Sequence, residues 1–277
     1  MRVLRPKSLP EAINMQKETN GSFIAGGTYS MVEINSDRFS PEYLIDLSLI
    51  DDLYGIKELE DKVYVGALTT FTDLENSEII SKLFPSLSKS ASEVGGPQVR
   101  NRGTVGGNIC AASPAADAAP ALLVLDATVE VCGINGARFI PINKFFLAPK
   151  KTCLNLDEIV VKIILPKNGS TSGFIKVGKR NALAVSSVNM AMSAVVSENK
   201  IASLKIAVGS AAPTPRLCPK TAAYIMENGT ELIKEAQDIL MEEISPIDDR
   251  WATAEYRRMV AKNMLEALIA EILEEKK

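Results

Sequence analysis

The stretch GGPQVRNRGTVGGNICAASPAADAAP, from Gly95 to Pro120, is the most informative part of this chain. It combines glycines with small polar residues, two arginines and a single acid, Asp117. Glycine permits positive φ angles and lets the backbone approach a ligand closely, so successive N–H groups can point at one anion. The pattern predicts a phosphate-binding loop. Its expected backbone and side-chain donors are Gly103, Thr104, Gly106, Gly107 and Asn108.

A second glycine-rich patch, AGGTYS at Ala25–Ser30, follows a short apolar run. Two such loops, far apart in the sequence, can close on one elongated anionic ligand, and a dinucleotide has the matching size. No G-x-G-x-x-G motif occurs, so a Rossmann site is not indicated. Residues Gly173–Lys179 match the G-x-x-x-x-G-K spacing of a P-loop, but Arg180 replaces the Ser or Thr that would hold magnesium, and we discount the match.

The charged residues of the first stretch have two interpretations each. Asp117 is either a carboxylate favoured at a helix start by the macrodipole or an acceptor for a ribose hydroxyl. Arg100 and Arg102 either offset phosphate charge or form surface ion pairs. The sequence leaves these alternatives open.

Composition narrows the class of protein. The 277 residues are 46% hydrophobic, enough for a sizeable core, and carry a net charge of −3. The lysines and arginines are scattered, which argues against a nucleic-acid partner. The N-terminus lacks the apolar run of a signal peptide, and no stretch approaches the roughly 18 apolar residues of a membrane span. We expect a cytoplasmic protein.

The sequence contains no histidine, which excludes Ser-His-Asp triads, histidine metal sites and histidine general bases. The four cysteines lie far apart without C-x-x-C spacing, so we expect no metal site in this chain and interpret the cysteines as buried free thiols. They are Cys110, Cys132, Cys153 and Cys218. An enzyme of this composition more plausibly carries a redox cofactor that supplies the chemistry itself.

Local patterns predict an α+β protein that begins with a small α/β unit. Ser8 and Glu11 form a possible capping box for a helix ending at Asn20–Gly21, and strands are expected at Phe23–Ala25 and Tyr43–Asp46. Hairpin signals follow from about Tyr54, and a helical stretch is expected near Phe71–Val94, interrupted at Pro85.

The second half of the pattern predicts two sheets separated by a linker. Strands Thr128–Cys132 and Arg138–Ile142 are expected to pair across Asn135–Gly136, and Glu158–Leu165 is a buried strand. The segment Pro166–Ser172 has the composition of a linker. Beyond it we expect three strands and a helical end. The strands are Phe174–Lys179, Ser187–Ser197 and Ile201–Gly209.

Four segments together resemble a known family. The segments AGGTYS, QVRNRGTVGGNICAASPAAD, FIKVGKR and SPIDDRWATAEYRRMVAKNML are similar to the FAD-binding medium subunits of molybdenum hydroxylases, the xanthine dehydrogenase and carbon monoxide dehydrogenase group. The resemblance covers nearly the whole chain, and TVGGN followed by SPAAD is its most specific part. One departure is Tyr29, where many relatives carry aspartate.

The resemblance implies the fold and its division. A two-part, PCMH-like FAD-binding domain is expected at 1–165, made of a small α/β unit at about 1–53 and a mixed sheet with helices at 54–165. A C-terminal flavoprotein domain of a three-stranded antiparallel sheet and helices is expected at 173–277.

The resemblance also implies a noncovalent FAD and its contacts. The pyrophosphate would lie between two loops, Asp117 would hold the adenosine ribose, the backbone near Val160 would meet the adenine, and Lys176 would approach the flavin ring as the catalytic residue. A cation at that place favours reduced, anionic flavin. The loop residues are Ala25, Gly26, Gly27, Thr28, Tyr29 and Ser30, with Thr104, Val105, Gly106, Gly107 and Asn108.

The implied function is electron transfer within an oxidoreductase complex. A large molybdenum-cofactor subunit and a small [2Fe-2S] subunit would be partner chains, and FAD would pass electrons to NAD or another acceptor. The likeness is greatest to xanthine dehydrogenase FAD subunits, which implies a purine substrate. The alternatives are the same role in a nicotinate, aldehyde or carbon monoxide dehydrogenase complex, a self-sufficient flavin reductase or oxidase, and a scaffold without FAD.

Overall fold

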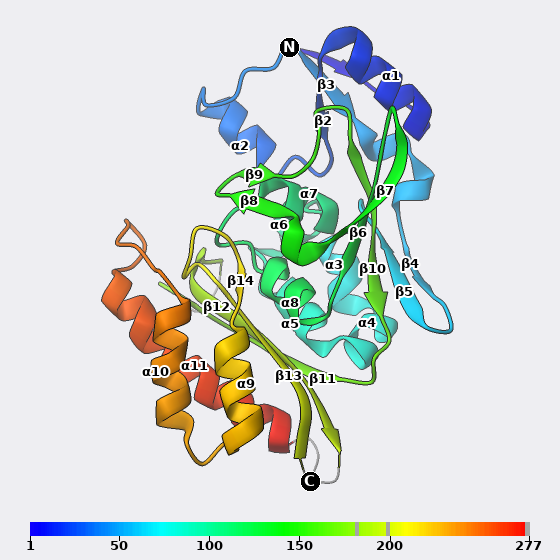
Figure 1. The fold of residues 1–277 in the computed structure, drawn as a ribbon. Coiled ribbons are helices and arrows are strands. Elements are labelled where there is room, and N and C mark those ends of the chain that lie inside the picture. The colour runs from blue at the N-terminus through cyan, green and yellow to red at the C-terminus, as the bar shows by residue number, and fades with distance from the viewer. Residues whose placement is uncertain (181–182, 198–199, 275–277) are drawn as a thin grey trace.

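A computed structural model of the chain describes residues 1–180, 183–197 and 200–274. It has the expected α+β architecture, in which three layers of sheet follow one another along the molecule (Figure 1). Within the described residues, no helix combines the length and apolar character that crossing a membrane requires.

The N-terminal unit is a three-stranded parallel sheet with the order β1-β3-β2. Helix α1 starts as predicted, because the Ser8 side chain accepts a hydrogen bond from the Glu11 N–H, and it stops at Asn20, whose φ of 52° is left-handed. The elements are β1 (Arg2–Leu4), α1 (Leu9–Thr19), β2 (Ser22–Ile24), α2 (Ser30–Asn35) and β3 (Tyr43–Asp46).

The next unit is a five-stranded antiparallel sheet, β4-β5-β10-β6-β7, whose central strand β10 is the predicted buried one. The predicted hairpin is confirmed, with Gly133 opposite Gly136. The strands are β4 (Ile56–Glu58), β5 (Lys62–Gly66), β6 (Thr128–Gly133), β7 (Gly136–Pro141) and β10 (Ile159–Pro166), with a small separate pair β8 (Phe146–Ala148) and β9 (Lys151–Thr152).

Helices cover this sheet, and their side chains pack into the same hydrophobic core. Two of them, α5 and α8, supply fully buried residues such as Leu87 and Leu122. The helices are α3 (Phe71–Asn76), α4 (Glu78–Leu83), α5 (Pro85–Ser92), α6 (Pro97–Arg100), α7 (Val105–Ala111) and α8 (Ala118–Val124). The helical stretch predicted from Phe71 is broken at Pro85 as expected, and it is broken again at Ser77, which caps a new helix, so three helices form.

The C-terminal unit has four antiparallel strands rather than the three predicted. The strand that was not predicted, β14, pairs with β13 at two residues only. It lies between prolines, which disfavour strands, and it is too short to show an alternating pattern of apolar and polar residues. The elements are β11 (Thr171–Gly178), β12 (Ser186–Ser197), β13 (Lys200–Gly209), β14 (Arg216–Leu217), α9 (Pro219–Asn228), α10 (Ile233–Glu243) and α11 (Ala254–Glu274).

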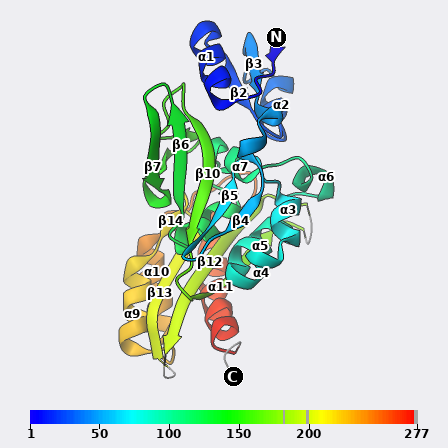
Figure 2. The same cartoon turned by 90° about the vertical axis from the view of Figure 1, so that its right-hand side faces the viewer.

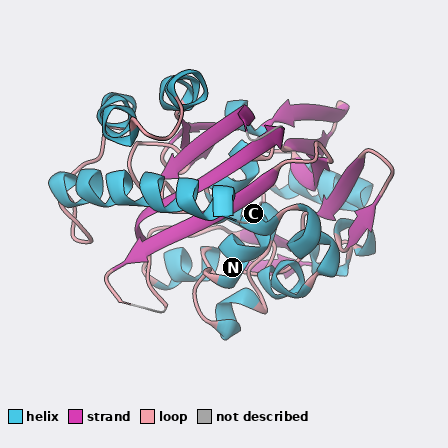
Figure 3. Ribbon diagram, turned by 90° about the horizontal axis from the view of Figure 1, so that it is seen from below, coloured by secondary structure: helices cyan, strands magenta, loops and turns pink. Residues whose placement is uncertain are grey.

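Strand alternation gives this last sheet two different faces. Val188, Met190 and Met192 of β12 pack in a core with the C-terminal helices, and the long helix α11 lies along that face (Figures 2 and 3). Ala191, which has the opposite orientation, packs with Phe174 in the core of the preceding unit. Residues of this second face therefore meet the preceding unit and can contribute to a site between the two.

Candidate cofactor site

A cavity of about 1000 Å³ lies where the three units meet. Its walls come from the loop after β2, the first turns of α7, the start of β10 and the segment before β12. The two glycine-rich patches line this one cavity, although about seventy residues separate them in the sequence. Among the predicted residues, those on its wall are Ala25, Gly26, Gly27, Thr28, Tyr29, Ser30, Gly103, Thr104, Gly106, Gly107, Asn108, Asp117 and Val160.

The loop of residues 26–30 carries free backbone donors. In the described part of the chain, its five backbone N–H groups donate to no acceptor. Gly27 has a φ of 73°, a conformation that other residues adopt only with strain. Consecutive free N–H groups on a concave backbone form an anion-binding nest. This loop has the chemistry expected of a pyrophosphate site.

The TVGGN segment has a different role from the one its glycines predict. It forms the first turns of helix α7, capped by Thr104, and none of Gly103, Gly106 and Gly107 has a positive φ. The N–H groups of residues 105–108 are already bonded to Thr69, Ala67 and Thr104. The prediction of a cradle of free N–H groups here is wrong. Val105 is fully buried and is the one predicted residue of this segment that does not line the cavity.

The glycines of this segment serve close packing instead. A Cβ atom on Gly106 would lie 2.7 Å from the carbonyl oxygen of Ala67. A Cβ atom on Gly26 would lie 1.7 Å from the carbonyl oxygen of Arg102. Glycine is therefore required where the two patches touch, and this contact fixes the free N–H groups against the α7 segment.

Asn108 offers a side-chain contact to a ligand. Its Oδ1 atom is buried and has no hydrogen-bond partner within the described structure, and the residue lines the cavity. Because buried polar atoms are rarely left unpaired, an atom of this kind at a cavity wall points to a ligand that supplies the donor.

The two arginines have different surroundings. Arg100 pairs with Glu75 at 2.7 Å, which confirms the ion-pair interpretation for this residue. Arg102 pairs with no carboxylate among the described residues and lies on a smaller cavity of about 240 Å³ beside the Gly26 contact. Of the two arginines, only Arg102 is therefore free to offset the charge of a bound phosphate.

Asp117 does not act as a helix cap. It precedes α8, but its side chain caps no N–H of that helix. Oδ1 accepts hydrogen bonds from Ser186 Oγ at 2.5 Å and Asn189 Nδ2 at 2.8 Å, and Oδ2 accepts one from Lys176 Nζ at 2.7 Å. Burial raises the pKa of this carboxyl group, and the three donors oppose that effect.

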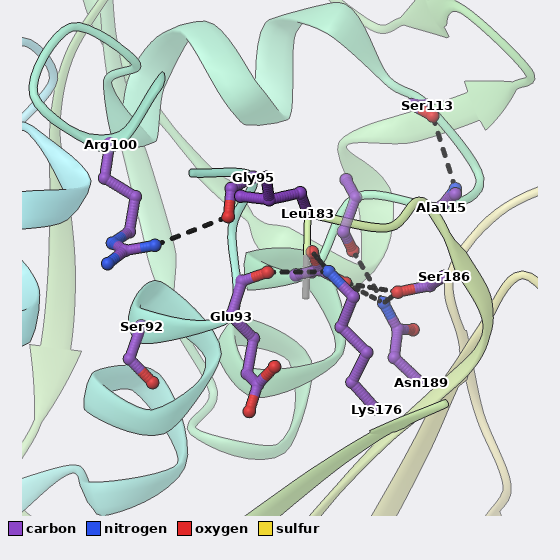
Figure 4. A network of polar contacts seen from close by, with 12 residues as sticks. Ser92, Glu93, Gly95, Arg100, Ser113, Ala115, Lys176, Leu183, Ser186 and Asn189 are labelled. Atoms are coloured by element: carbon purple, nitrogen blue, oxygen red, sulfur yellow. Dashed lines mark hydrogen bonds and ion pairs between the residues drawn. The ribbon is translucent and has the colours of Figure 1, made fainter. Parts of the chain in front are cut away.

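Lys176 lies behind the cavity wall rather than on it. Its side chain is 6% exposed, and Nζ also donates to the carbonyl oxygen of Glu93 at 2.7 Å (Figure 4). An extended FAD holds its adenosine ribose and its flavin ring on opposite sides of the pyrophosphate. Because Asp117 and Lys176 are in contact at 2.7 Å, the two residues cannot reach these opposite ends of one extended FAD. The expected division, with Asp117 at the adenosine ribose and Lys176 at the flavin ring, does not fit this geometry.

The wall near Val160 is built around an ion pair, in which the Glu158 side chain is 7% exposed and the Arg138 side chain is 43% exposed. Arg138 of β7 contacts both carboxylate oxygens of Glu158 at 2.6 and 2.7 Å and the carbonyl oxygen of Cys153 at 3.0 Å. The pKa of Glu158 is lowered, chiefly by its hydrogen bonds with Arg138. The turn of residues 153–158 that leads to Val160 is thereby fixed to the β6–β7 hairpin.

Several wall residues have no motif that identifies them. Leu183 and Val185, in the segment before β12, line the cavity and are 54% and 44% exposed. The only feature of the sequence that marks them is that they are apolar residues in a connecting loop. Lys150 lies with Nζ 5.6 Å from the centre of the Tyr29 ring and 3.3 Å from Glu33. This cation–π contact holds the Tyr29 side chain beside Lys150.

The ion pair at the Val160 wall carries a prediction. Replacing Arg138 by Met removes the cation beside Glu158 and frees the turn, so we expect weaker cofactor binding and a modest loss of stability, since the arginine side of the pair is exposed to solvent. Titrating added FAD into apoprotein measures the first, and urea unfolding measures the second. Arg2→Met, which removes an exposed cation on β1, is the control and should change neither.

The same pair predicts a pH dependence. The lowered pKa of Glu158 stabilises the fold fully above the unfolded-state value of about 4.3, and this stabilisation is lost as pH falls through the lower folded-state pKa. The difference in unfolding free energy between the wild type and Glu158→Gln should therefore shrink in acid. A difference that is constant with pH would contradict the assignment.

The cysteines are all unpaired, but only Cys218 is buried as predicted. Cys110 is exposed and lies on the cavity wall, and Cys132 and Cys153 are half-buried. Within the part of the chain that the structure describes, no group of His, Cys, Asp and Glu side chains is arranged to bind a metal ion.

Cys110 therefore provides a test of cavity occupancy. We expect a small alkylating reagent to modify it slowly at neutral pH and faster as pH rises, because the thiolate is the reactive form. Added FAD should block the reaction if it fills this cavity. Peptide mass analysis locates the label, and Cys110→Ser supplies the blank. Equal labelling with and without FAD would contradict occupancy of this wall.

Comparison with known proteins agrees with this geometry. Residues 1–168 match the family described as FAD binding domain in molybdopterin dehydrogenase, and residues 174–272 match the CO dehydrogenase flavoprotein C-terminal domain. Among curated relatives, the xanthine dehydrogenase FAD-binding subunit of Escherichia coli O157:H7 is 30% identical over 275 residues, covering 96% of this chain and 94% of the relative.

Two further similarities concern other substrates. The nicotinate dehydrogenase FAD-subunit of Eubacterium barkeri is 37% identical over 201 residues, covering 70% of this chain and 68% of the relative. The structure of carbon monoxide dehydrogenase from Hydrogenophaga pseudoflava, in a form lacking the Mo-pyranopterin moiety of its molybdenum cofactor, superposes with a TM-score of 0.94 at 28% identity, covering 98% of this chain and 96% of that one.

Proposed function

We propose, from the premise that this chain belongs to the family of FAD-binding subunits of molybdenum hydroxylases, that it transfers electrons inside a larger complex. It is an FAD-binding oxidoreductase subunit. The observation that carries the electron-transfer role is a cavity with free N–H donors and an unpaired Asn108 Oδ1 in a chain without histidine. Such a chain binds the cofactor and leaves substrate oxidation to a partner.

The proposed partners follow from the relatives. A large subunit with the molybdenum cofactor would oxidise the substrate, and a small subunit would relay electrons through [2Fe-2S] clusters. FAD, once bound, accepts electrons singly and gives up a pair to NAD or another acceptor. The similarity to carbon monoxide dehydrogenase over 98% of this chain supports an assembly of that kind. The cytoplasmic location expected from the sequence stays a prediction.

FAD would be bound noncovalently, with different residues of this chain contacting different groups of the cofactor. The N–H groups of residues 26–30 would donate to the pyrophosphate, and Asn108 Oδ1 would accept from the cofactor. The Asp117 carboxylate would accept a hydrogen bond from a hydroxyl group of the ribose or the ribityl chain. The backbone at Val160 would lie beside the adenine. The domain limits 1–165 and 173–277 remain part of this proposal, with the two family matches as support.

For the substrate, we propose a purine of the xanthine type. The support is identity to a xanthine dehydrogenase subunit over 96% of this chain. The nicotinate dehydrogenase subunit has higher identity over a shorter part, so nicotinate is the second candidate. The substrate would be bound by the partner subunit and not by the flavin subunit. Similarity between flavin subunits therefore supports a substrate only indirectly, through the partner that each of them serves.

The test uses the complex purified from its source through this chain. After oxygen is removed, xanthine, nicotinate, an aldehyde or carbon monoxide is added singly, and bleaching of the flavin absorbance is followed. Bleaching by xanthine alone supports the proposal, and bleaching by another compound reassigns the substrate. A chain that co-purifies with no molybdenum or iron–sulfur subunit and holds FAD would instead indicate a self-sufficient flavoenzyme, whereas one without FAD would indicate a scaffold.

A further inference from the structure

We propose that Lys176 is a positioning residue, which keeps Asp117 ionised and oriented as the hydroxyl acceptor for FAD. This inference rests on the proposed role of Asp117 and changes that of Lys176. Among the described residues that line the cavity, Asp117 is present and Lys176 is not. Lys176 therefore acts on the cofactor through the carboxylate in front of it.

The register of the C-terminal sheet produces this arrangement. Lys176 of β11 lies directly opposite Asn189 of β12, so both side chains leave the same face of the sheet. This is the face that packs against α8, which follows Asp117. Both side chains reach the Asp117 carboxylate, Lys176 at Oδ2 and Asn189 at Oδ1 (Figure 4 shows both donors).

The hydrogen bonds leave one place for a ligand. A carboxylate has roughly two acceptor sites on each oxygen. Oδ1 already accepts from Ser186 and Asn189, whereas Oδ2 accepts from Lys176 alone. A hydroxyl group of the cofactor can therefore donate to Oδ2. This acceptor is strong only while Asp117 is charged, because a charge-assisted hydrogen bond is stronger than a neutral one.

Lys176 is the charge that keeps Asp117 ionised. Both side chains are more than nine-tenths buried, and burial favours the neutral acid. From β12, the groups that face the carboxylate are the uncharged Ser186 and Asn189. The segment after α5 contributes the Glu93 carbonyl, while the Glu93 carboxylate pairs with Lys89 at 3.4 Å. Removing Lys176 therefore leaves Asp117 without its compensating cation.

The experiment measures the FAD dissociation constant of apoprotein against pH, in the wild type, Lys176→Met, Asp117→Asn and the double variant. In the wild type, affinity should fall as pH drops through the pKa of Asp117. In Lys176→Met this fall should occur about one to three pH units higher, since a nearby opposite charge lowers an acid's pKa by that amount. Asp117→Asn and the double variant should bind weakly at every pH, with no such step.

The outcomes separate this inference from the proposed function. If Asp117→Asn binds FAD as the wild type does, the proposed contact is wrong. If that variant binds weakly but Lys176→Met keeps the wild-type pH profile, the positioning role is overturned. A shifted flavin potential in Lys176→Met without a shifted binding profile would also overturn it, in favour of direct contact with the ring.

A second variant protects the test against misfolding. Ser186→Ala removes the 2.5 Å hydrogen bond to Oδ1 and leaves the buried charges balanced. We expect a shift of the binding profile in the same upward direction as for Lys176→Met, but a smaller one. A folded Ser186→Ala protein whose profile shifts as far as that of Lys176→Met would overturn the proposal, because an uncharged donor would then matter as much as the cation.

Discussion

Replacing Gly26 by Ala is expected to abolish FAD retention. The new methyl group would lie 1.7 Å from the carbonyl oxygen of Arg102 and 2.6 Å from its carbonyl carbon. Both are backbone atoms, so no side-chain rotation relieves the clash, and the two glycine-rich patches must separate. Overpacking of this kind costs about 1–3 kcal/mol of stability. The loss of binding is larger, because the free N–H groups of residues 26–30 depend on this contact.

The flavin absorbance of the purified protein and its urea midpoint measure both effects. Ser30→Ala is the matched control, because it lies in the same loop, keeps every backbone N–H group and introduces no clash. We expect it to retain FAD. A yellow Gly26→Ala protein with wild-type affinity would show that the loop around Gly26 does not hold the cofactor.

The sequence predicts the local elements of this fold well, because their signals are local. The Ser8 cap, the turn at Asn135–Gly136 and the alternating pattern of Ser187–Ser197 each depend on neighbouring residues, and the structure has all three elements. The expectation that the two glycine patches lie together is also met, since both line one cavity.

The roles within the site could not be predicted in the same way. In TVGGN, glycines needed for close packing against Ala67 have the same sequence appearance as glycines needed for anion binding. Asp117 and Lys176 are 59 residues apart, and only the packing of the β11–β12 sheet against α8, which follows Asp117, brings them together. Arg138 and Glu158 pair for a similar reason, across two strands. Such contacts are tertiary and have no local signal.

Replacing Asp117 by Ala is expected to have the largest effect on stability. It leaves Lys176 as an uncompensated cation that is 6% exposed, and it removes the acceptor for Ser186 and Asn189. Breaking a buried ion pair by removing one partner costs about 3–5 kcal/mol. Urea unfolding of the apoprotein measures this loss without any contribution from cofactor binding.

The double variant Asp117→Ala/Lys176→Met identifies the cause. If the loss comes from the unpaired charge, removing Lys176 as well should restore part of the stability, because no buried cation remains. The exposed pair of Lys205 and Asp126 is the matched control, with side chains 35% and 49% exposed, and Asp126→Asn should cost at most about 1 kcal/mol. Losses that simply add in the Asp117→Ala/Lys176→Met protein would contradict the pairing, since two independent sites give additive changes, whereas one buried pair cannot be broken twice.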